Sequence, residues 1–333
     1  MSKKLSLLLV IMLLSVTILS SCAKAEEGTA EATISVPATS APATDTLSGN
    51  ITISGAFALY PMMTRWAEEY QKIHPNVTFD VSGGGAGKGM TDALSGAVDI
   101  GMVSRSVTDE ETAQGAYTIP VVKDAVFPVV NAQNPAADKL KTQGISQAMF
   151  VKIFVTGEVT TWGEVVGDPT ITDEIHVYTR SDSCGAADIW AKFLGGKQDD
   201  LQGIGVDGDP GLLAAVISDP LGIGYNNLGY AFDLTTGLTT EGALIVPIDD
   251  NNDGIANDDE VADSLEKAVE LIKAEKYPEP PARVENLVTN GKPSGLVADF
   301  INWILTDGQQ FVSEAGYVQL SEDQLNTSLG LLK

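Results

Sequence analysis

Short apolar stretches alternate with amphipathic segments from residue 51 to near the end of the chain. A short apolar run is typical of a buried strand, and an apolar period of 3.6 residues is typical of a helix. Regular alternation of the two predicts an α/β fold with largely parallel sheets. The extended segment 117–130 is expected to cross between domains. Strands are expected at 51–54, 77–81, 99–103, 175–179, 223–225 and 243–247, and helices at 62–73, 88–94, 147–154, 187–194, 263–275, 296–305 and 309–314.

The N-terminus has the pattern of an export signal. Two lysines precede an apolar run at 5–19, which is too short for a comfortable membrane span. The run ends in Leu-Ser-Ser-Cys, which resembles a bacterial lipobox, so residues 1–21 are expected to be a signal peptide and Cys22 the lipidated residue. Segment 22–47 is rich in Ala, Thr, Glu, Ser and Pro and is expected to be a flexible tether. An ordinary signal peptide with a chance cysteine is the alternative.

The charge balance is strongly acidic, with 45 Asp and Glu against 20 Lys and Arg and a formal net charge of −25. This balance argues against a protein that binds nucleic acid. Two cysteines exclude a disulfide framework, and two histidines exclude a histidine-rich metal site. No set of nucleophile, base and orienting group is evident, since Cys184 has only His74 and His176 as candidate bases. We therefore expect a binding protein and not an enzyme.

Three turns, each between a predicted strand and a predicted helix, have the composition of an anion cradle. Small residues let the backbone approach a ligand, and free N–H groups at a helix start favour negative charge. Arg180 would add a bidentate contact to an oxyanion. One such turn is weak evidence, but three in one exported chain together indicate an oxyanion site. The turns read SGAFALYP at 54–61, SGGGAGKG at 82–89 and RSDSCGA at 180–186.

These segments resemble the substrate-binding subunits of phosphate ABC transporters over about residues 50–331. The likeness begins with ISGAFALYPMMTRWAEEYQKIHP and VSGGGAGKGMTDALSGAVDIGMVSR, which are similar to the family's first two strand, turn and helix units. IFVTGEVTTWGEV resembles a stretch between the lobes, and RSDSCGA occupies the place of an R-x-D-x-S-G-T motif. IGYNNLGY and NGKPSGLVADFINWILTDGQQFVSEAGYVQL are similar to later family segments.

The resemblance implies a two-lobed periplasmic-binding-protein fold of type II, with the ligand in a cleft that closes by hinge motion. Lobe 1 would comprise 48–122 and 246–333, and lobe 2 would comprise 123–245. The implied protein is a monomer, anchored by lipid on the extracytoplasmic face of the membrane, that delivers phosphate or a related oxyanion to an ABC permease. The implied ligand-binding residues are Ala58, Leu59, Ala86, Gly87, Ser104, Arg105, Arg180, Cys184, Gly185 and Ala186.

Several of these positions depart from the family pattern, because the chain has lost hydroxyl groups there. Ala58, Ala86, Cys184 and Ala186 stand where relatives usually carry serine or threonine. Arg105 stands where some relatives carry an aspartate that accepts a proton from phosphate, although one branch of the family has arginine. The ligand is therefore expected to be an oxyanion, with phosphate as the leading choice. A family member whose ligand has changed, acting as a sensor or adhesion protein, is the alternative.

Residues 249–260 fit the pattern of an EF-hand calcium loop. Gly254 provides the sharp turn at position 6 of the loop, and Ile255 offers its carbonyl at position 7. The predicted ligands of a structural Ca²⁺ are Asp249, Asn251, Asp253, Ile255, Asn257 and Glu260, followed by an exiting helix at 261–274. An acidic surface loop without a metal is the alternative.

Overall fold

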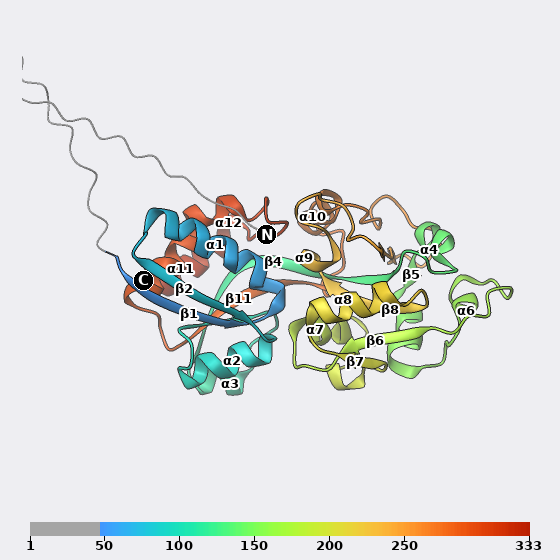
Figure 1. Cartoon of the computed structure of the whole chain (residues 1–333), viewed down its shortest axis with the longest axis horizontal. Helices are drawn as coiled ribbons and strands as arrows, with labels where there is room; N and C mark the ends of the chain where they lie inside the picture. The colour runs from blue at the N-terminus through green and yellow to red at the C-terminus, as the bar shows by residue number, and fades with distance from the viewer. Residues whose placement is uncertain (1–46) are drawn as a thin grey trace, which may run out of the picture. The chain divides into compact units, whose positions relative to one another are not determined.

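The computed structural model describes residues 47–333 (Figure 1). The predicted signal peptide, Cys22 and the tether as far as residue 46 lie outside the described residues. Among the helices of the described part, none is long and apolar enough to cross a membrane.

The first part of the chain folds into strand and helix units, as predicted. β1 (Gly49–Gly55) pairs in parallel with β2 (Val77–Gly83) on one side and with β3 (Ile100–Val103) on the other. The crossovers are α1 (Tyr60–Ile73), which has Pro61 in its first turn, and α2 (Ala86–Ser95). Each helix follows directly on a turn at the carboxyl end of a strand, so the first two predicted turns lie at one edge of this sheet.

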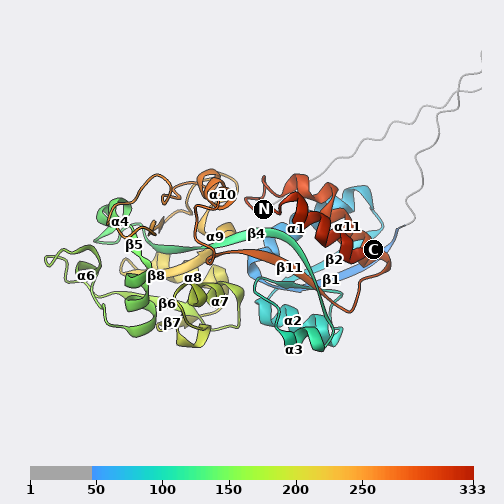
Figure 2. The same ribbon diagram turned by 180° about the vertical axis from the view of Figure 1, so that it is seen from behind.

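β4 (Ala116–Asn131) is a 16-residue strand that belongs to both halves of the sheet. Its first half pairs with β11 (Ala282–Asn290), and its second half pairs with β8 (Gly222–Asn227) and β9 (Ala243–Ile245). Figure 2 shows β4 and β11 running side by side. This confirms the predicted crossing segment. These three partners and β12 (Val318–Gln319) are all antiparallel to β4, so the sheet is mixed rather than largely parallel.

The far half of the sheet carries the third predicted turn. β6 (His176–Arg180) pairs in parallel with β7 (Ile204–Val206) and with β8. α7 (Gly185–Phe193) follows the turn after β6, and α8 (Gly208–Ser218) follows β7. The turn at 180–186 therefore has the same strand-to-helix setting as the first two turns.

Two separate hydrophobic cores define the two lobes. The core of lobe 1 includes Trp66, Tyr70 and Phe300, and the core of lobe 2 includes Phe127 and Trp190, all of them fully buried. Aromatic edge-to-face contacts occur in both cores, with ring centroids 4.9 Å apart for Tyr70 and Phe300. The expected two-lobed α/β fold is thus present.

The boundary expected at residue 246 differs from the packing that the structure shows. Ile248, Leu271 and Tyr277 are buried in the core of lobe 2. Strand pairing of Ile248 with Ile145 and the apolar face of the helix at 265–273 hold this segment there. The chain consequently returns to lobe 1 only along β11.

The remaining elements complete the two lobes, with two differences from the predicted helices. The helix expected at 147–154 ends at Val151 and continues as a π-helical turn, and the helix expected at 309–314 is a 3₁₀ helix at 307–311. The further elements are η1 (Phe57–Leu59), α3 (Asp109–Ala113), α4 (Ala137–Gln143), β5 (Ile145–Ser146), α5 (Gln147–Val151), η2 (Lys152–Thr156), α6 (Trp162–Val166), η3 (Gln198–Asp200), α9 (Leu228–Ala231), β10 (Ile248–Asp249), α10 (Leu265–Lys273), α11 (Gly295–Leu305), η4 (Asp307–Phe311), β12 (Val318–Gln319) and α12 (Glu322–Leu332).

Candidate functional site

The structure brings the three predicted turns together. Within lobe 1, the N–H of Gly85 donates to the carbonyl of Gly55 at 3.0 Å, which joins the first two turns. Across the lobes, the N–H of Gly87 donates to the carbonyl of Ser183 at 3.2 Å. We call the residues 54–61, 82–89 and 180–186 the cradle.

Most of the predicted ligand-binding residues are buried, and Gly185 and Ser104 are buried where the lobes meet. Gly185 packs so closely on lobe 1 that an ideal Cβ on it would lie 2.0 Å from the Ser104 Oγ. Of the ten predicted residues, Gly87 and Arg105 are partly exposed. The buried ones are Ala58, Leu59, Ala86, Ser104, Arg180, Cys184, Gly185 and Ala186.

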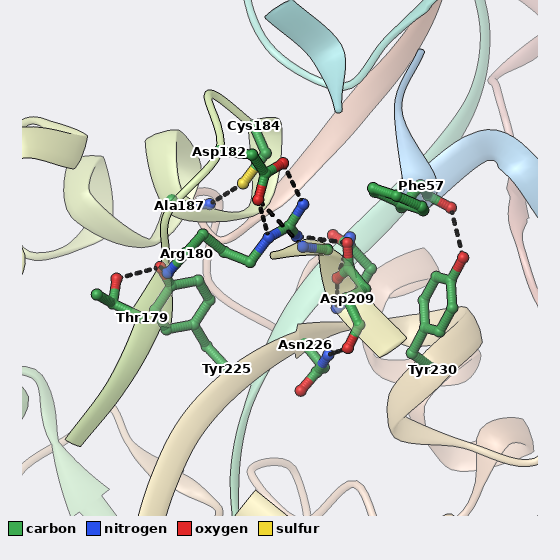
Figure 3. Close-up of polar contacts among 12 residues, drawn as sticks. Phe57, Thr179, Arg180, Asp182, Cys184, Ala187, Asp209, Tyr225, Asn226 and Tyr230 are labelled. Carbon is green, nitrogen blue, oxygen red and sulfur yellow. Dashed lines mark hydrogen bonds and ion pairs between the residues drawn. The ribbon is translucent and has the colours of Figure 1, made fainter. Parts of the chain in front are cut away.

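Arg180 is held by two carboxylates inside the cradle (Figure 3). Its Nε and Nη2 donate to the two oxygens of Asp182 at 2.7 and 2.6 Å. Its Nη1 donates to Asp209 Oδ2 at 2.5 Å. The side chain of Arg180 is fully buried, and that of Asp209 is 1% exposed. The guanidinium is therefore a paired structural charge.

The electrostatics of this group follow from burial and from that pairing. Burial works against the charge of Arg180, but Asp209 and Asp182 outweigh it and raise the pKa of the guanidinium. Burial likewise opposes the charge of Asp182, and Arg180 outweighs it, so that the pKa of Asp182 is lowered. One arginine and two carboxylates carry a formal charge of −1, so the group as it stands does not attract an anion.

A buried polar network continues from Asp209 to the strands that connect the lobes. Asn227 donates its side-chain Nδ2 to Asp209 Oδ1 at 2.6 Å. Arg283 on β11 donates to Asn227 Oδ1 and to Asp124 Oδ2, and its Nε donates to Glu285 Oε1 at 2.7 Å. Burial raises the pKa of Asp124 to about 8. The cleft is thus linked to the crossing strands by direct contacts.

Phe57 packs between the two lobes beside Arg180. The Arg180 Cζ lies 5.6 Å from the centroid of the Phe57 ring. The same ring packs on Gly83 of lobe 1 and Gly208 of lobe 2. The Tyr230 hydroxyl of lobe 2 donates to the Phe57 carbonyl at 3.2 Å, as Figure 3 shows. Phe57 therefore joins the lobes by apolar packing.

Several backbone N–H groups of the cradle already have protein acceptors, contrary to the expectation that they are free. Besides Gly85 and Gly87, the N–H of Ala56 donates to the Met102 carbonyl at 2.9 Å. The N–H of Cys184 donates to Gln198 Oε1 at 3.3 Å. These groups would have to exchange partners before they could bind an anion.

Cys184 acts as the N-cap of α7. Its Sγ accepts a hydrogen bond from the N–H of Ala187 at 3.4 Å. A serine hydroxyl at this position would accept the same hydrogen bond. Burial raises the pKa of the Cys184 thiol to about 12. The candidate base His176 is bonded elsewhere, with its Nδ1 2.6 Å from Asp219 Oδ2. A reactive thiolate is therefore disfavoured.

Arg105 lines a hollow of about 640 Å³ between the lobes, beside the cradle. We call it the interlobe hollow; it is lined by residues from 105–108 of lobe 1 and from 181–199 of lobe 2. Glu111 accepts two hydrogen bonds from Arg105, at 2.7 and 3.0 Å. The hydrogen bond to Glu111 raises the pKa of Arg105 despite partial burial.

The predicted calcium loop packs on lobe 2, against residues 142–146. Asp249 accepts the N–H groups of Asp253 and Gly254, each at 3.1 Å. The Asn257 Nδ2 donates to Asp253 Oδ2 at 3.2 Å and to Glu260 Oε2 at 3.3 Å. The predicted ligands are therefore neighbours in one hydrogen-bonded loop.

Two features of this loop differ from those of a standard EF-hand. The exiting helix begins at Leu265 and not at residue 261, because Ser264 caps it. Within residues 47–333, no three His, Cys, Asp or Glu side chains lie in an arrangement that could hold a metal ion. The amide of Asn257 lies between the carboxylates instead.

Sequence reasoning missed the acids that pair with the two arginines. Asp209 lies 29 residues after Arg180, and no local pattern connects them. The Gly208-Asp209-Pro210 sequence does indicate a helix start, with an acid in its first turn. Glu111 belongs to a capping box with Thr108, and that motif was available as a signal.

Comparison with known proteins supports a single family. Residues 39–308 match the model of a PBP superfamily domain. The chain is 26% identical to the phosphate-binding protein PstS of Methanocaldococcus jannaschii, over 85% of this chain and 86% of that protein. It is 25% identical to the phosphate-binding protein PstS of Bacillus subtilis, over 85% of each.

A solved structure supports the fold. A putative phosphate ABC transporter substrate-binding protein from Clostridium perfringens, with bound phosphate, matches with a TM-score of 0.66 and 22% identity. The match covers 82% of this chain and all of that one. Because the family model spans most of the chain and this structure has the same fold, the chain belongs to the PBP superfamily.

Proposed function

We propose that this protein is an extracytoplasmic solute-binding protein that captures an oxyanion, with phosphate first among the candidates, and delivers it to an ABC permease. The convergence of three strand-to-helix turns from two lobes is the observation that carries the proposal. Two curated relatives that match over 85% of the chain are phosphate-binding proteins. The export pattern and Cys22 support a lipid anchor on the extracytoplasmic face of the membrane.

The cradle offers an oxyanion fewer hydroxyl donors than the family pattern does. A hydrogen bond to a charged group stabilises a complex by about 1.5–3 kcal/mol, so three or four missing hydroxyl donors would cost several orders of magnitude in affinity. Arg180 is already paired with two carboxylates. The ligand is therefore an oxyanion that receives contacts beyond those of the cradle.

Titration calorimetry tests this function. Phosphate is titrated into the protein from residue 23 onward, after unfolding and refolding remove any bound ligand. Saturable binding at micromolar or lower concentration is expected. The absence of heat at millimolar phosphate, from protein shown to be folded by circular dichroism, would contradict capture of phosphate. Permease and ATPase genes beside the gene would support transport over sensing or adhesion.

We also propose that residues 249–260 bind a structural Ca²⁺. The sequence fills each ligand position of the loop, and oxygen ligands suit this cation. The Asn257 amide donates to the carboxylates of Asp253 and Glu260. A bound cation would replace these hydrogen bonds and neutralise both charges. The bound ion would fix an acidic loop against residues 142–146.

Melting followed by circular dichroism, in calcium and in a chelator, tests this site. A higher midpoint in calcium is expected, and Glu260→Gln should abolish the difference. Asp258→Asn is the matched control, because it removes one charge from the same loop at a position that is not a predicted ligand. Equal midpoints in calcium and chelator for the unmodified protein would refute the site.

A further inference from the structure

The interlobe hollow has hydroxyl groups, although the predicted contact positions Ala58, Ala86, Cys184 and Ala186 lack them. Four of its lining residues bear hydroxyls: Ser106 and Thr108 from lobe 1, and Ser181 and Ser183 from lobe 2. All four are exposed. Hydroxyls from both lobes thus surround a space that a ligand can reach.

The hollow also has cationic side chains in a strongly acidic protein. Arg105, Lys192 and Lys197 line it together with Asp188 and Asp199, and Glu111 pairs with Arg105. Lys192 is 2.8 Å from Asp188, whereas Lys197 has no ion-pair partner within residues 47–333. In a chain with a formal net charge of −25, an unpaired lysine beside two further cations in one hollow favours an anionic ligand.

Arg105 retains the capacity to bind such a ligand. Its Nη1 donates to the carbonyl of Ser106 and to Glu111, and its Nη2 donates to Glu111. A guanidinium has five N–H donors, so the Nε–H and one Nη2 hydrogen have no acceptor within the described part of the chain. Arg180 differs, since its side chain is fully buried and paired with two carboxylates.

The size and chemistry of the hollow fit a small organic anion. Its volume of about 640 Å³ lies in the range of pockets for small-molecule ligands, about 300–1,000 Å³, and far exceeds the needs of one phosphate ion. Most of its lining residues carry a hydroxyl, a cation or a carboxylate, which suit hydroxyls and negative charge on the ligand.

We propose that the interlobe hollow binds a small phosphorylated polyol, such as a sugar phosphate. The four hydroxyls of the lining meet the polyol, and Arg105 with the two lysines meets the phosphoryl group. This inference rests on the proposed function as an oxyanion receptor and narrows its ligand class. Inorganic phosphate would use only part of the same set of contacts.

Calorimetry with the protein from residue 23 onward, which keeps every described residue, tests the ligand class. The probes are inorganic phosphate, glucose 6-phosphate, glycerol 3-phosphate and glucose. At least one of the two esters should bind about tenfold or more tightly than inorganic phosphate, because it gains contacts to the hydroxyls and the lysines. Glucose alone should not bind.

Lysine variants test the location of the site. Lys197→Gln should weaken binding of the tighter ester by about fivefold or more, since it removes the unpaired cation. Lys292→Gln is the matched control, because Lys292 is an exposed lysine outside the hollow with no ion pair within residues 47–333. It should leave binding unchanged.

The outcomes separate the two proposals. Inorganic phosphate that binds as tightly as both esters, or more tightly, would overturn this inference and leave the proposed function intact. Equal binding of glucose and glucose 6-phosphate would also overturn it, as would unchanged ester affinity in Lys197→Gln. No binding of any of the anions by folded protein would overturn both proposals.

Discussion

A methyl group added at Gly185 should hold the two lobes apart. An ideal Cβ at this position would lie 2.0 Å from the Ser104 Oγ and 2.1 Å from the Ser104 carbonyl oxygen. Gly185 begins α7 in lobe 2, and Ser104 follows β3 in lobe 1. Since the second contact is with backbone, a change of side-chain rotamer cannot relieve the overlap, and separation of the lobes can.

The magnitude follows from the cost of overpacking. An extra methyl in a packed site destabilises it by about 1–3 kcal/mol, which corresponds to a change of about 5- to 150-fold in the equilibrium between closed and open forms. The N–H of Gly87 reports on this equilibrium, because it lies in the first turn of α2 and bonds to Ser183 of the other lobe.

Amide hydrogen exchange measured by NMR makes the test. In Gly185→Ala, the Gly87 amide should exchange about 5- to 150-fold faster than in the unmodified protein. The Gly85 amide is the internal control, because its acceptor, Gly55, lies in the same lobe. Gly330→Ala is the control variant, since a Cβ there meets no atom within 4 Å. Unchanged exchange at Gly87 would refute the reasoning.

Three further predictions concern buried groups. Asp209→Asn should lower the free energy of unfolding by about 3 kcal/mol in urea titrations, because it leaves Arg180 buried with half of its pairing, whereas Asp188→Asn on the surface should cost under about 1 kcal/mol. Burial raises the pKa of Asp124 to about 8, so its contribution to stability is present below about pH 4 and is lost as the pH rises through about 8. Unfolding free energies at pH 5, 7 and 9 should therefore decline less in Asp124→Asn than in the unmodified protein, and parallel declines would refute the shift. Cys184 should react with an aromatic disulfide reagent at pH 8 at least about 100-fold more slowly in folded than in unfolded protein, and rapid labelling of the folded form would contradict the raised pKa.

The elements that the sequence predicted correctly are those with a local cause. The helix after Pro61 and the strand at 77–81 follow from periodicity and turn chemistry within a few residues. The long extended segment 117–130 was predictable because Pro120 and Pro128 disfavour a helix there. Local signals also located the three turns, which the fold then brought together.

β11 was missed because its stabilising interactions are not local. Its polar residues Arg283 and Glu285 are buried, which hides the alternation typical of a strand. They are tolerated because Arg283 meets Asp124, 159 residues earlier in the chain. Non-local packing also explains the error in the lobe boundary. Sequence order alone placed the segment from residue 246 to β11 in lobe 1, but its apolar side chains pack in the core of lobe 2.

The two arginines show why the site was only partly predictable. An arginine beside a turn of small residues has the same sequence pattern whether its charge is free to bind a ligand or is paired with a carboxylate of the protein. Arg180 meets Asp182 and Asp209 in the interior, so its charge serves the fold. Arg105, which lines the interlobe hollow, meets one carboxylate and has two N–H groups without an acceptor within the described residues. We therefore expect the ligand to bind at the exposed rim, where hydroxyls and cations come from both lobes, and not only at the buried positions that have lost their hydroxyls.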